Sequence, residues 1–513
     1  MTARRQDATG WHRLLVGLSV ALLLVVALAG PNAAKPDLRS GWPLDGLLPV
    51  GLSSHVVALL LWVAYAVGAA AVVLSLWRRV RPTGWSVPLG LGAVALVAAP
   101  MGSGDHLNYA AYGRILLLGG DPWTASPADF GGGTDPITSA VEEPWRTEPS
   151  VYGPAATILH AAAAAAGGEH LRLVVLAWQV VVVAAWLAVR WGLRCLVDPP
   201  HHGRVDSLWT LNPLVLSVGL LGAHVDTVAA ALVVLAIALF TRLSAAAAPV
   251  TAGVLVGLAA GMKFTYAVAL AAIVLAGIGV PHTLSRISGW HRAALLLAGF
   301  LPTTAILHVW TGGHVYDQVG RSRGAVSLAS PWRLFLEWAT PQFGGADTRT
   351  AISITATVVM IAMAALLAWA TRSAAAGPGR VGEEGSRHTD GKGDLALARR
   401  MAWSIVVLTA AYALIAPYTL PWYDLFAWAV LPVVAPTFLD DVLLARLTLI
   451  AAAYVPGRIL GMSPGVEAFT LGWRREVTPW LQLLLWVLAA VVLSRAGARS
   501  GSPRSPWPRP PGQ

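Results

Sequence analysis

A carboxylate, an amide and two phenols are spaced along one short segment, GDHLNYAAYGR at residues 104–114, so that they could act together. If this segment is helical, its polar side chains fall at positions i, i+3, i+4 and i+7 and share one face: Asp105, Asn108, Tyr109 and Tyr112. Such a face suits holding a polyol and removing one of its protons. The structural alternative is that Asp105 caps the helix by accepting hydrogen bonds from the first-turn amides.

Aromatic residues follow at turns rich in glycine and proline. The sequence reads GGDPW at 119–123 and VYGP at 151–154, with Trp145 between them. Glycine and proline predict sharp turns, and Trp123 and Tyr152 are rings of the kind that pack against the apolar face of a sugar. A belt of aromatic residues at a membrane surface would use the same residues, so both interpretations stay open.

A histidine and a carboxylate lie close together farther along the chain. The motif NPL at 212–214 opens a short apolar run that ends in His224 and Asp226. His224 could bind an anion as imidazolium, and Asp226 could orient it. The pair is too sparse for a metal site, which usually needs three or four ligands; the alternative is a hydrogen-bonded turn.

Four basic residues are candidates to meet a phosphate. Lys263 interrupts an apolar stretch, and Arg321, Arg323 and Arg333 lie together in a later polar segment. Arginine matches two phosphate oxygens at once. Their other use would be contact with lipid headgroups.

The last such segment, PYTLPWYD at 417–424, joins two apolar runs. Its two prolines predict a rigid turn. Its rings, among them Trp422 and Tyr423, are suited to a membrane surface or to sugar binding.

The composition of the chain indicates which kind of element positions these residues, namely apolar segments long enough to span a membrane. Of 513 residues, 56% are hydrophobic and only 12% are charged, about half the share of ordinary soluble domains, and the mean hydropathy is +0.63. Apolar runs such as 14–28, 56–77 and 228–240 recur along the chain, and about 20 such residues span a bilayer. A soluble enzyme, a secreted disulfide scaffold (Cys195 is the single cysteine) and a nucleic-acid-binding domain are excluded. The net charge of +10 and the pI of about 10.1 fit basic residues on a cytoplasmic face.

The fold class that these runs predict is an all-α, polytopic transmembrane bundle of about 12–14 spans, with short interfacial helices in its outer loops. Fourteen runs are the candidate spans: 14–30, 56–77, 86–102, 171–189, 208–222, 227–241, 248–262, 264–280, 293–310, 351–370, 401–417, 424–438, 446–460 and 479–494. With the N-terminus in the cytoplasm, 23 of the 36 Lys and Arg residues fall inside, as the positive-inside rule requires. All the segments described above then lie on the outer face.

This topology predicts the organisation of the chain. The motif ALAG at 27–30 resembles a signal-peptidase site, but we expect an uncleaved anchor. Residues 155–166 are expected to form a short surface helix, and 373–394 a flexible linker. The expected divisions are N-terminal spans 1–102, a first large extracellular loop 103–170 with the carboxylate, central helices 171–371 with an outer loop 311–350, a cytoplasmic linker 372–400, C-terminal helices 401–499 and a disordered tail 500–513.

Together these motifs resemble a family, the actinobacterial polyprenol-phosphate-mannose-dependent mannosyltransferases of the GT-C class of membrane glycosyltransferases. The likeness covers about residues 85–440 and rests on the order of the motifs around Asp105, Trp123, Tyr152, His224 and Trp422. Many relatives carry Tyr where this chain has Trp123, which leaves sugar preference open.

The resemblance implies what the chain would do. It implies a multi-pass cell-membrane enzyme whose active site is extracellular. Mannose would pass from polyprenyl-phosphate mannose to an envelope glycan or glycolipid acceptor of the lipomannan type, by a single inverting displacement. Asp105 would be the general base. Lys263, His224 and the three arginines would meet the donor phosphate. The remaining candidates would bind sugar: Asn108, Tyr109, Tyr112, Trp123, Tyr152, Asp226, Trp422 and Tyr423. Neither a metal nor a cofactor is expected.

Three alternatives remain. A GT-C enzyme could use another sugar such as arabinose, and a non-catalytic envelope assembly protein could share the scaffold. A transporter or flippase of a lipid-linked sugar would place ionisable residues near the bilayer midplane and often show repeats. The predicted spans are almost uncharged at their centres and no repeat is visible, which favours the enzyme.

Overall fold

The computed structural model describes residues 2–38, 47–48, 50–242, 247–278, 289–317, 320, 324–376, 390–458 and 460–498. Within these residues the chain is all-α, with two isolated bridges and no strand. Among these described residues, eight helical segments are long and apolar enough to cross a membrane. They are α1 (Thr2–Leu28), α2 (Ser54–Trp77), α6 (Leu171–Leu196), α9 (Val225–Arg242), α12 (Gly289–Thr311), α15 (Gly345–Ala376), α16 (Asp390–Ile415) and the run of α19 (Pro464–Gly472), η12 (Trp473–Val477) and α20 (Thr478–Ala498).

Shorter helices fill the bundle between them. Four are apolar: α3 (Ser86–Val97), α5 (Pro154–Gly167), α10 (Ala247–Met262) and α11 (Val268–Ile278), which η7 (Phe264–Ala267) precedes. The others are α4 (Asp105–Leu117), α7 (His202–Val205), α8 (Pro213–Val215), α14 (Trp332–Phe343), α17 (Leu425–Val430) and α18 (Phe438–Ala453), with short 3₁₀ or π turns that include η5 (Asp206–Thr210), η6 (Leu216–Leu221), η10 (Pro421–Asp424) and η11 (Leu431–Val433).

Several of the fourteen predicted runs do not form continuous helices over the predicted residues in the described structure, and three of them show why. The run 208–222 becomes α8 and the π turn η6, because Pro213 lacks an N–H and the Asn212 side chain caps the new start by accepting from Leu214 N at 3.1 Å. The run 424–438 is divided into α17 and η11 at Pro432. The run 446–460 is displaced to α18, 438–453.

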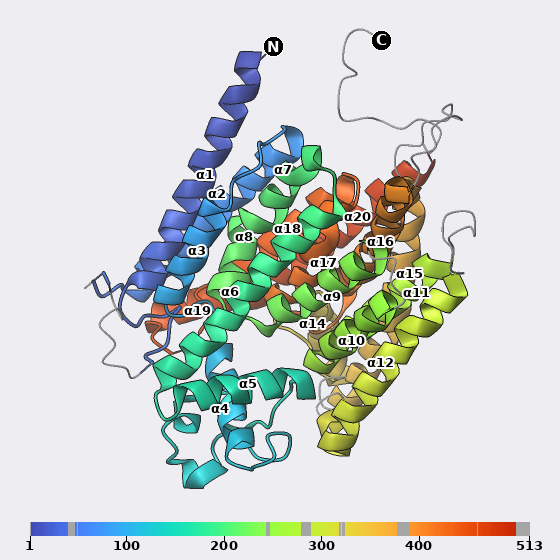
Figure 1. Cartoon of the computed structure of the whole chain (residues 1–513). Helices are drawn as coiled ribbons and strands as arrows, with labels where there is room; N and C mark the ends of the chain where they lie inside the picture. The colour runs from blue at the N-terminus through green and yellow to red at the C-terminus, as the bar shows by residue number, and fades with distance from the viewer. Residues whose placement is uncertain are drawn as a thin grey trace, which may run out of the picture.

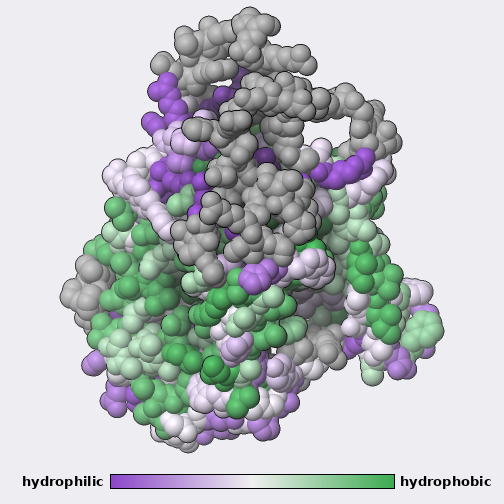
Figure 2. Space-filling view, turned by 45° about the vertical axis from the view of Figure 1, so that its right-hand side comes forward, coloured by the Kyte–Doolittle hydropathy of each residue, from purple (hydrophilic) through white to green (hydrophobic). Residues whose placement is uncertain are grey.

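The outer surface of the bundle matches a membrane protein. Many of its long helices expose large apolar side chains, among them Ile306, Val309, Ile354 and Leu484. Figure 2 shows apolar residues across the middle of one face, with hydrophilic residues gathered toward the upper and lower ends. This distribution is that of a polytopic protein whose middle lies in lipid.

Helices α4 and α5 lie together at the end of the bundle away from the N-terminus (Figure 1), which we call the 103–170 end. The helix expected at 155–166 exists as α5, yet much of it is buried, including Ala156, His160 and Ala164. A Cβ on Gly113 of α4 would lie 2.2 Å from His160 O, so glycine there permits the close packing of α4 on α5.

The opposite end is fixed by a buried ion network. Asp206 accepts from Arg190 at 2.9 Å and from Arg194 at 2.7 Å, and also from Thr83 N at 2.8 Å. These contacts hold the segment after α2 against α6 and η5. The expected linker 373–394 and tail 500–513 lie largely outside the described residues, although α16 already begins at Asp390.

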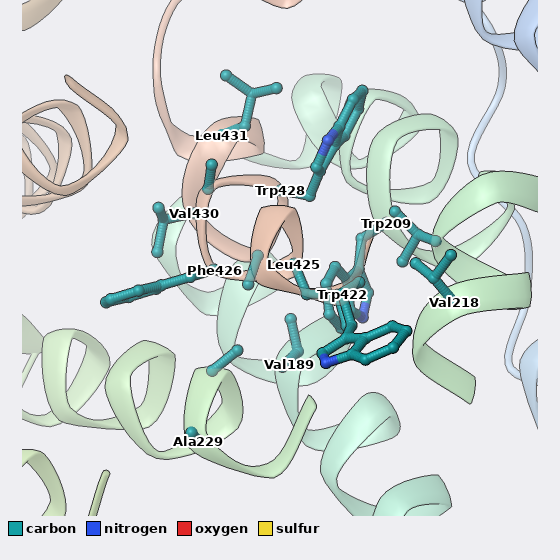
Figure 3. Close-up of a cluster of buried hydrophobic side chains, with 14 of the residues drawn as sticks. Val189, Trp209, Val218, Ala229, Trp422, Leu425, Phe426, Trp428, Val430 and Leu431 are labelled. Atoms are coloured by element: carbon teal, nitrogen blue, oxygen red, sulfur yellow. The ribbon is translucent and has the colours of Figure 1, made fainter. Parts of the chain in front are cut away.

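The centre of the bundle is packed with large apolar side chains around α17. Leu425, Phe426 and Trp428 are buried on this short helix, and Trp209 of η5 lies beside them (Figure 3). Phe426 stacks on Tyr266 with the ring centroids 4.1 Å apart. This core supports the turn that precedes α17, and that turn carries Trp422.

Candidate functional site

Asp105 begins α4 at the 103–170 end and is buried, with 7% of its surface exposed. Gly104 is the N-cap residue, and no described contact joins the Asp105 carboxylate to the first-turn amides. The carboxylate instead accepts from the Tyr152 hydroxyl at 3.4 Å, and its Oδ2 lies 3.7 Å from Nε2 of His224. Asp105 therefore faces other chemistry-bearing residues, and the capping interpretation has no support.

The surroundings of Asp105 raise its pKa from 3.8 to about 7. Burial is the largest cause, because it disfavours the charged form. The positive charge of Lys263 acts against it, the negative charge of Asp226 adds to it, and the Tyr152 hydroxyl lowers it slightly. A carboxyl that titrates near neutrality is suited to accept a proton during a reaction.

His224 is held by both of its ring nitrogens. Nδ1 lies 2.6 Å from Val218 O, and a carbonyl only accepts, so Nδ1 carries a proton. Nε2 lies 3.0 Å from the Ser103 hydroxyl, which donates to it when the ring is neutral, and Ser103 Oγ in turn accepts from Asp105 N at 3.3 Å. The imidazole thus orients the start of α4, and both nitrogens that the sequence suggested for an anion have protein partners.

The local backbone explains how His224 reaches this place. The π turn η6 is wider than an α-helix, and π turns recur at functional sites; here Val218 O accepts from the His224 ring. Ala223 adopts a left-handed φ of 51°, which is uncommon outside glycine, and its carbonyl accepts from the Trp178 indole at 2.7 Å. A Cβ on Gly222 would lie 2.5 Å from Nδ1 of His224, so this turn requires glycine.

Lys263 and Asp226 form a partly buried ion pair beside Asp105. Lys263 Nζ donates to the two carboxylate oxygens of Asp226 at 2.9 and 3.2 Å and lies 3.3 Å from the centroid of the Tyr423 ring. The Tyr266 hydroxyl also donates to Asp226 O at 2.9 Å. The Lys263 side chain therefore neither extends to the lipid headgroups nor lacks a protein partner. Its ammonium group lies between the Asp226 carboxylate and the face of the Tyr423 ring.

The predicted sugar-binding rings mostly line the wall of the site. The Tyr109 ring stacks on His160 at 4.7 Å, and its hydroxyl accepts from Val225 N at 3.4 Å. The Tyr112 hydroxyl donates to Glu148 O at 3.0 Å. Asn108, on the same helix, is buried. This helix face is thus packed in the protein.

Trp123 and Trp422 complete the aromatic wall. Trp123 is buried, and its indole N–H donates to Tyr152 O at 2.8 Å, so it supports the residue that contacts Asp105. Trp422 stacks on His224 with centroids 3.9 Å apart. Trp422 and Tyr423 belong to a turn about 200 residues later than His224. Figure 3 shows Trp422 next to α17.

The predicted arginines do not join this group in the described structure. Arg333 forms an ion pair with Glu337 at 2.7 Å, and Arg475 contacts the same carboxylate at 3.0 Å. Arg321 and Arg323 lie outside the described residues.

Sequence reasoning missed other polar residues around the candidate site. Ser103 forms a hydrogen bond with the His224 ring. Arg446 is fully buried, and a terminal nitrogen of its guanidinium lies 3.7 Å from Oδ1 of Asp424. Arg458 forms an ion pair with Glu142 and donates to Asn32 O at 2.8 Å, which ties the 103–170 region to two distant segments. The sequence feature that could have identified such a residue is a single arginine within an apolar run, as at Arg446.

The site is closed. A cavity of about 20 Å³ lies against the face of His224 and Trp422 and is also lined by Tyr65, Ser217 and Tyr454. This volume holds about one water molecule, so a sugar ring does not fit in this cavity as it stands. In the described parts of the chain, no group of three or more His, Cys, Asp or Glu residues is arranged to hold a metal ion.

The fold and the site together define a polytopic helical membrane protein with a buried carboxyl–cation cluster at one end. The family model described as alpha-(1->6)-mannopyranosyltransferase, N-terminal domain, matches residues 14–279. The chain belongs to this family.

A curated relative is similar over a shorter stretch. It is alpha-(1->6)-mannopyranosyltransferase A of Corynebacterium glutamicum, 27% identical over 187 residues, which are 36% of this chain and 36% of the relative. The match thus spans about a third of the relative's length. No solved structure matches the chain.

Proposed function

We propose that the chain is a membrane mannosyltransferase that transfers mannose from polyprenyl-phosphate mannose to a glycan or glycolipid acceptor on the extracellular face. The observation that carries the proposal is the buried Asp105, with a pKa near 7, beside the Lys263–Asp226 pair in a member of this family. The name of the curated relative supports mannose as the sugar and an α-1,6 linkage as the product.

The proposed reaction is one displacement at the anomeric carbon. The Asp105 carboxylate removes the proton of the acceptor hydroxyl, and the hydroxyl oxygen forms a bond to C1 of mannose. The bond between C1 and the phosphate oxygen breaks, and its electron pair leaves with polyprenyl phosphate. Attack from the face opposite the leaving group converts a β-linked donor into an α-linked product.

The leaving phosphate needs a positive charge close to the reacting carbon. Lys263 is a cation whose charge acts on the Asp105 carboxyl, and it would share that charge between Asp226 and the phosphate. Arg333 would reach the donor only by leaving Glu337. Arg321 and Arg323 stay further candidates. His224 and Trp422 would fix the sugar side of the site, with the other predicted rings behind them.

Transfer of labelled mannose from synthetic polyprenyl-phosphate mannose by purified protein tests this proposal. Asp105→Asn should lower kcat about 10²–10⁴-fold, the usual contribution of a general base. Asp347→Asn, on an exposed carboxylate of α15, is the matched control and should retain activity. Full activity in a folded Asp105→Asn variant would remove Asp105 as the base. Movement of the intact lipid-linked sugar across vesicles without glycoside formation would indicate a flippase instead.

A further inference from the structure

The turn 416–424, which we call the Trp422 turn, supplies two of the side chains that enclose the candidate site. Trp422 stacks on His224, and Tyr423 lies over Lys263 with its ring centroid 3.3 Å from Nζ. Both contacts reach residues that surround Asp105. The position of this turn therefore determines where Trp422 and Tyr423 lie in the aromatic wall and how the Lys263 cation is placed against it.

Arg446 holds the Trp422 turn from α18. Its Nε donates to Ala413 O at 2.9 Å, in the last turn of α16, and its second terminal nitrogen donates to the Thr419 hydroxyl at 2.9 Å. The same nitrogen lies 3.7 Å from Oδ1 of Asp424, where the turn ends. One guanidinium thus contacts the helix before the turn, its middle and its last residue, as its planar fork allows.

Burial makes these contacts informative. Arg446 and Asp424 are both fully buried, and the helix around Arg446 is otherwise apolar, as Leu443, Leu447 and Ile450 show. Burying an arginine is costly unless its hydrogen bonds are satisfied by partners. An apolar residue would pack in α18 without that cost, so a requirement of the turn explains the arginine better than packing does.

A second contact holds the turn from its other side. Ser327 N donates to Pro417 O at 3.0 Å, and Ser327 Oγ donates to Thr419 O at 2.9 Å while accepting from Thr419 N at 3.1 Å. Thr419 is therefore fixed through its backbone by Ser327 and through its side chain by Arg446. Loss of either partner would leave the other in place, which makes the contribution of Arg446 measurable.

We propose that Arg446 is a positioning residue that fixes the Trp422 turn and so places Trp422 and Tyr423 at the substrate site. The inference rests on the proposed function for its effect on catalysis, but the effect on the turn is independent of it. Arg446 itself contacts neither Asp105 nor Lys263. It acts through Thr419, Asp424 and the end of α16.

The effect on the turn can be measured without substrate. Cys195 is the single cysteine, so Cys195→Ala with Tyr418→Cys gives one thiol at a half-buried position of the turn. Arg446→Met in this background should raise the rate of thiol labelling at least 10-fold, and Arg446→Lys, which keeps the charge without the fork, should raise it less. Arg475→Met removes an exposed arginine that contacts Glu337, and it should leave the rate unchanged. An unchanged rate in folded Arg446→Met would overturn the proposal.

A double variant separates positioning from charge neutralisation. Arg446→Met leaves Asp424 buried without its counter-charge, so a loss of folding alone would explain little. Arg446→Met with Asp424→Asn removes both charges and should recover the thermal midpoint while labelling stays fast. Recovery of slow labelling in the double variant would mean that Arg446 serves only to neutralise Asp424, which would contradict the proposal.

Kinetics then connect the turn with the site. In the mannose-transfer assay, the double variant should raise KM for the donor about 10-fold or more, because Trp422 and Tyr423 are no longer held. If the labelling result holds and no mannose transfer is found in the parent protein, the turn assignment stands and the proposed function fails. Fast labelling with unchanged KM and kcat would show that the turn is held for another reason and would overturn the link to the site.

Discussion

At the scale of single residues, the candidate site depends on the charge balance around one buried carboxyl group. Burial raises the pKa of Asp105 to about 7, while Lys263 opposes the rise and Asp226 adds to it. Lys263 is itself paired with Asp226, so Asp105 meets a pair whose charges largely cancel. A carboxylate in this position is ready to take up a proton near neutral pH.

This balance predicts how stability changes with pH. A carboxyl whose pKa is higher in the folded chain than in the unfolded chain contributes most below the unfolded value and loses that contribution as pH rises to the folded value. For Asp105 the loss runs from about pH 4 to about pH 7 and amounts to roughly 4 kcal/mol. Asp105→Asn should therefore stabilise the protein, and by more at pH 8 than at pH 5.

Thermal unfolding of the purified protein at the two pH values measures this difference. Asp347→Asn, on an exposed side chain, should change the midpoint by the same amount at both values. Equal midpoints for the wild type and Asp105→Asn at pH 8 would show that the carboxyl is not buried as described.

At the scale of the elements, the site is assembled where α5 meets α10. Gly153 N donates to Met262 O at 3.0 Å, and a Cβ on Gly153 would lie 2.2 Å from Gly261 O. Tyr152 directly precedes Gly153 in the chain, and its hydroxyl donates to Asp105, while Lys263 directly follows Met262. Close approach of the two segments is therefore what brings the carboxyl and the cation to the same place.

Gly153→Ala should accordingly impair the site more than the fold. The added methyl group must push the backbone at Gly261 away, since a carbonyl cannot yield as a flexible side chain does. We expect kcat/KM for mannose transfer to fall at least 10-fold, with a lower thermal midpoint. Gly465→Ala in α19, where a Cβ meets no atom within 4 Å, is the matched control and should change neither quantity. Wild-type kinetics in Gly153→Ala would mean that the segments are not so close in the membrane.

At the scale of the whole molecule, α4, which begins with Asp105, lies at one end of the bundle, and α7 lies toward the other (Figure 1). Asp206, which directly follows α7, forms the buried ion pairs with Arg190 and Arg194. The positive-inside rule orients such a bundle. The Lys and Arg distribution of the sequence predicts that the 103–170 end faces outward.

Thiol labelling in intact cells tests this orientation. In a Cys195→Ala background, Thr134→Cys at the 103–170 end should react with a membrane-impermeant reagent. Asp198→Cys, exposed after α6, should react only once the membrane is opened. The reverse pattern would place the site in the cytoplasm and would contradict the proposed extracellular reaction.

Many residues of the candidate site could be proposed from local sequence, but the contacts between them could not. Asp105, Lys263, His224 and Trp422 stand out because each is unusual in an apolar surrounding or at a turn, and that signal is local. The contact between Lys263 and Asp226 spans 37 residues, and the stacking of Trp422 on His224 spans far more. Such pairs depend on which helix ends meet, and hydropathy carries no information about that.

The sequence by itself determined that this is a helical membrane protein with its chemistry-bearing residues near the ends of apolar runs. Each polar group placed in lipid costs free energy at its own position in the chain, so the pattern of hydropathy shows where the apolar segments lie. Only the tertiary structure decided that Lys263 pairs with Asp226, that Tyr109 and Tyr112 are packed into the wall, and that Arg446 holds the Trp422 turn. The physical reason is that the burial and the ion pairing of a side chain depend on which helices pack against one another. The partners of these side chains lie far away in the chain.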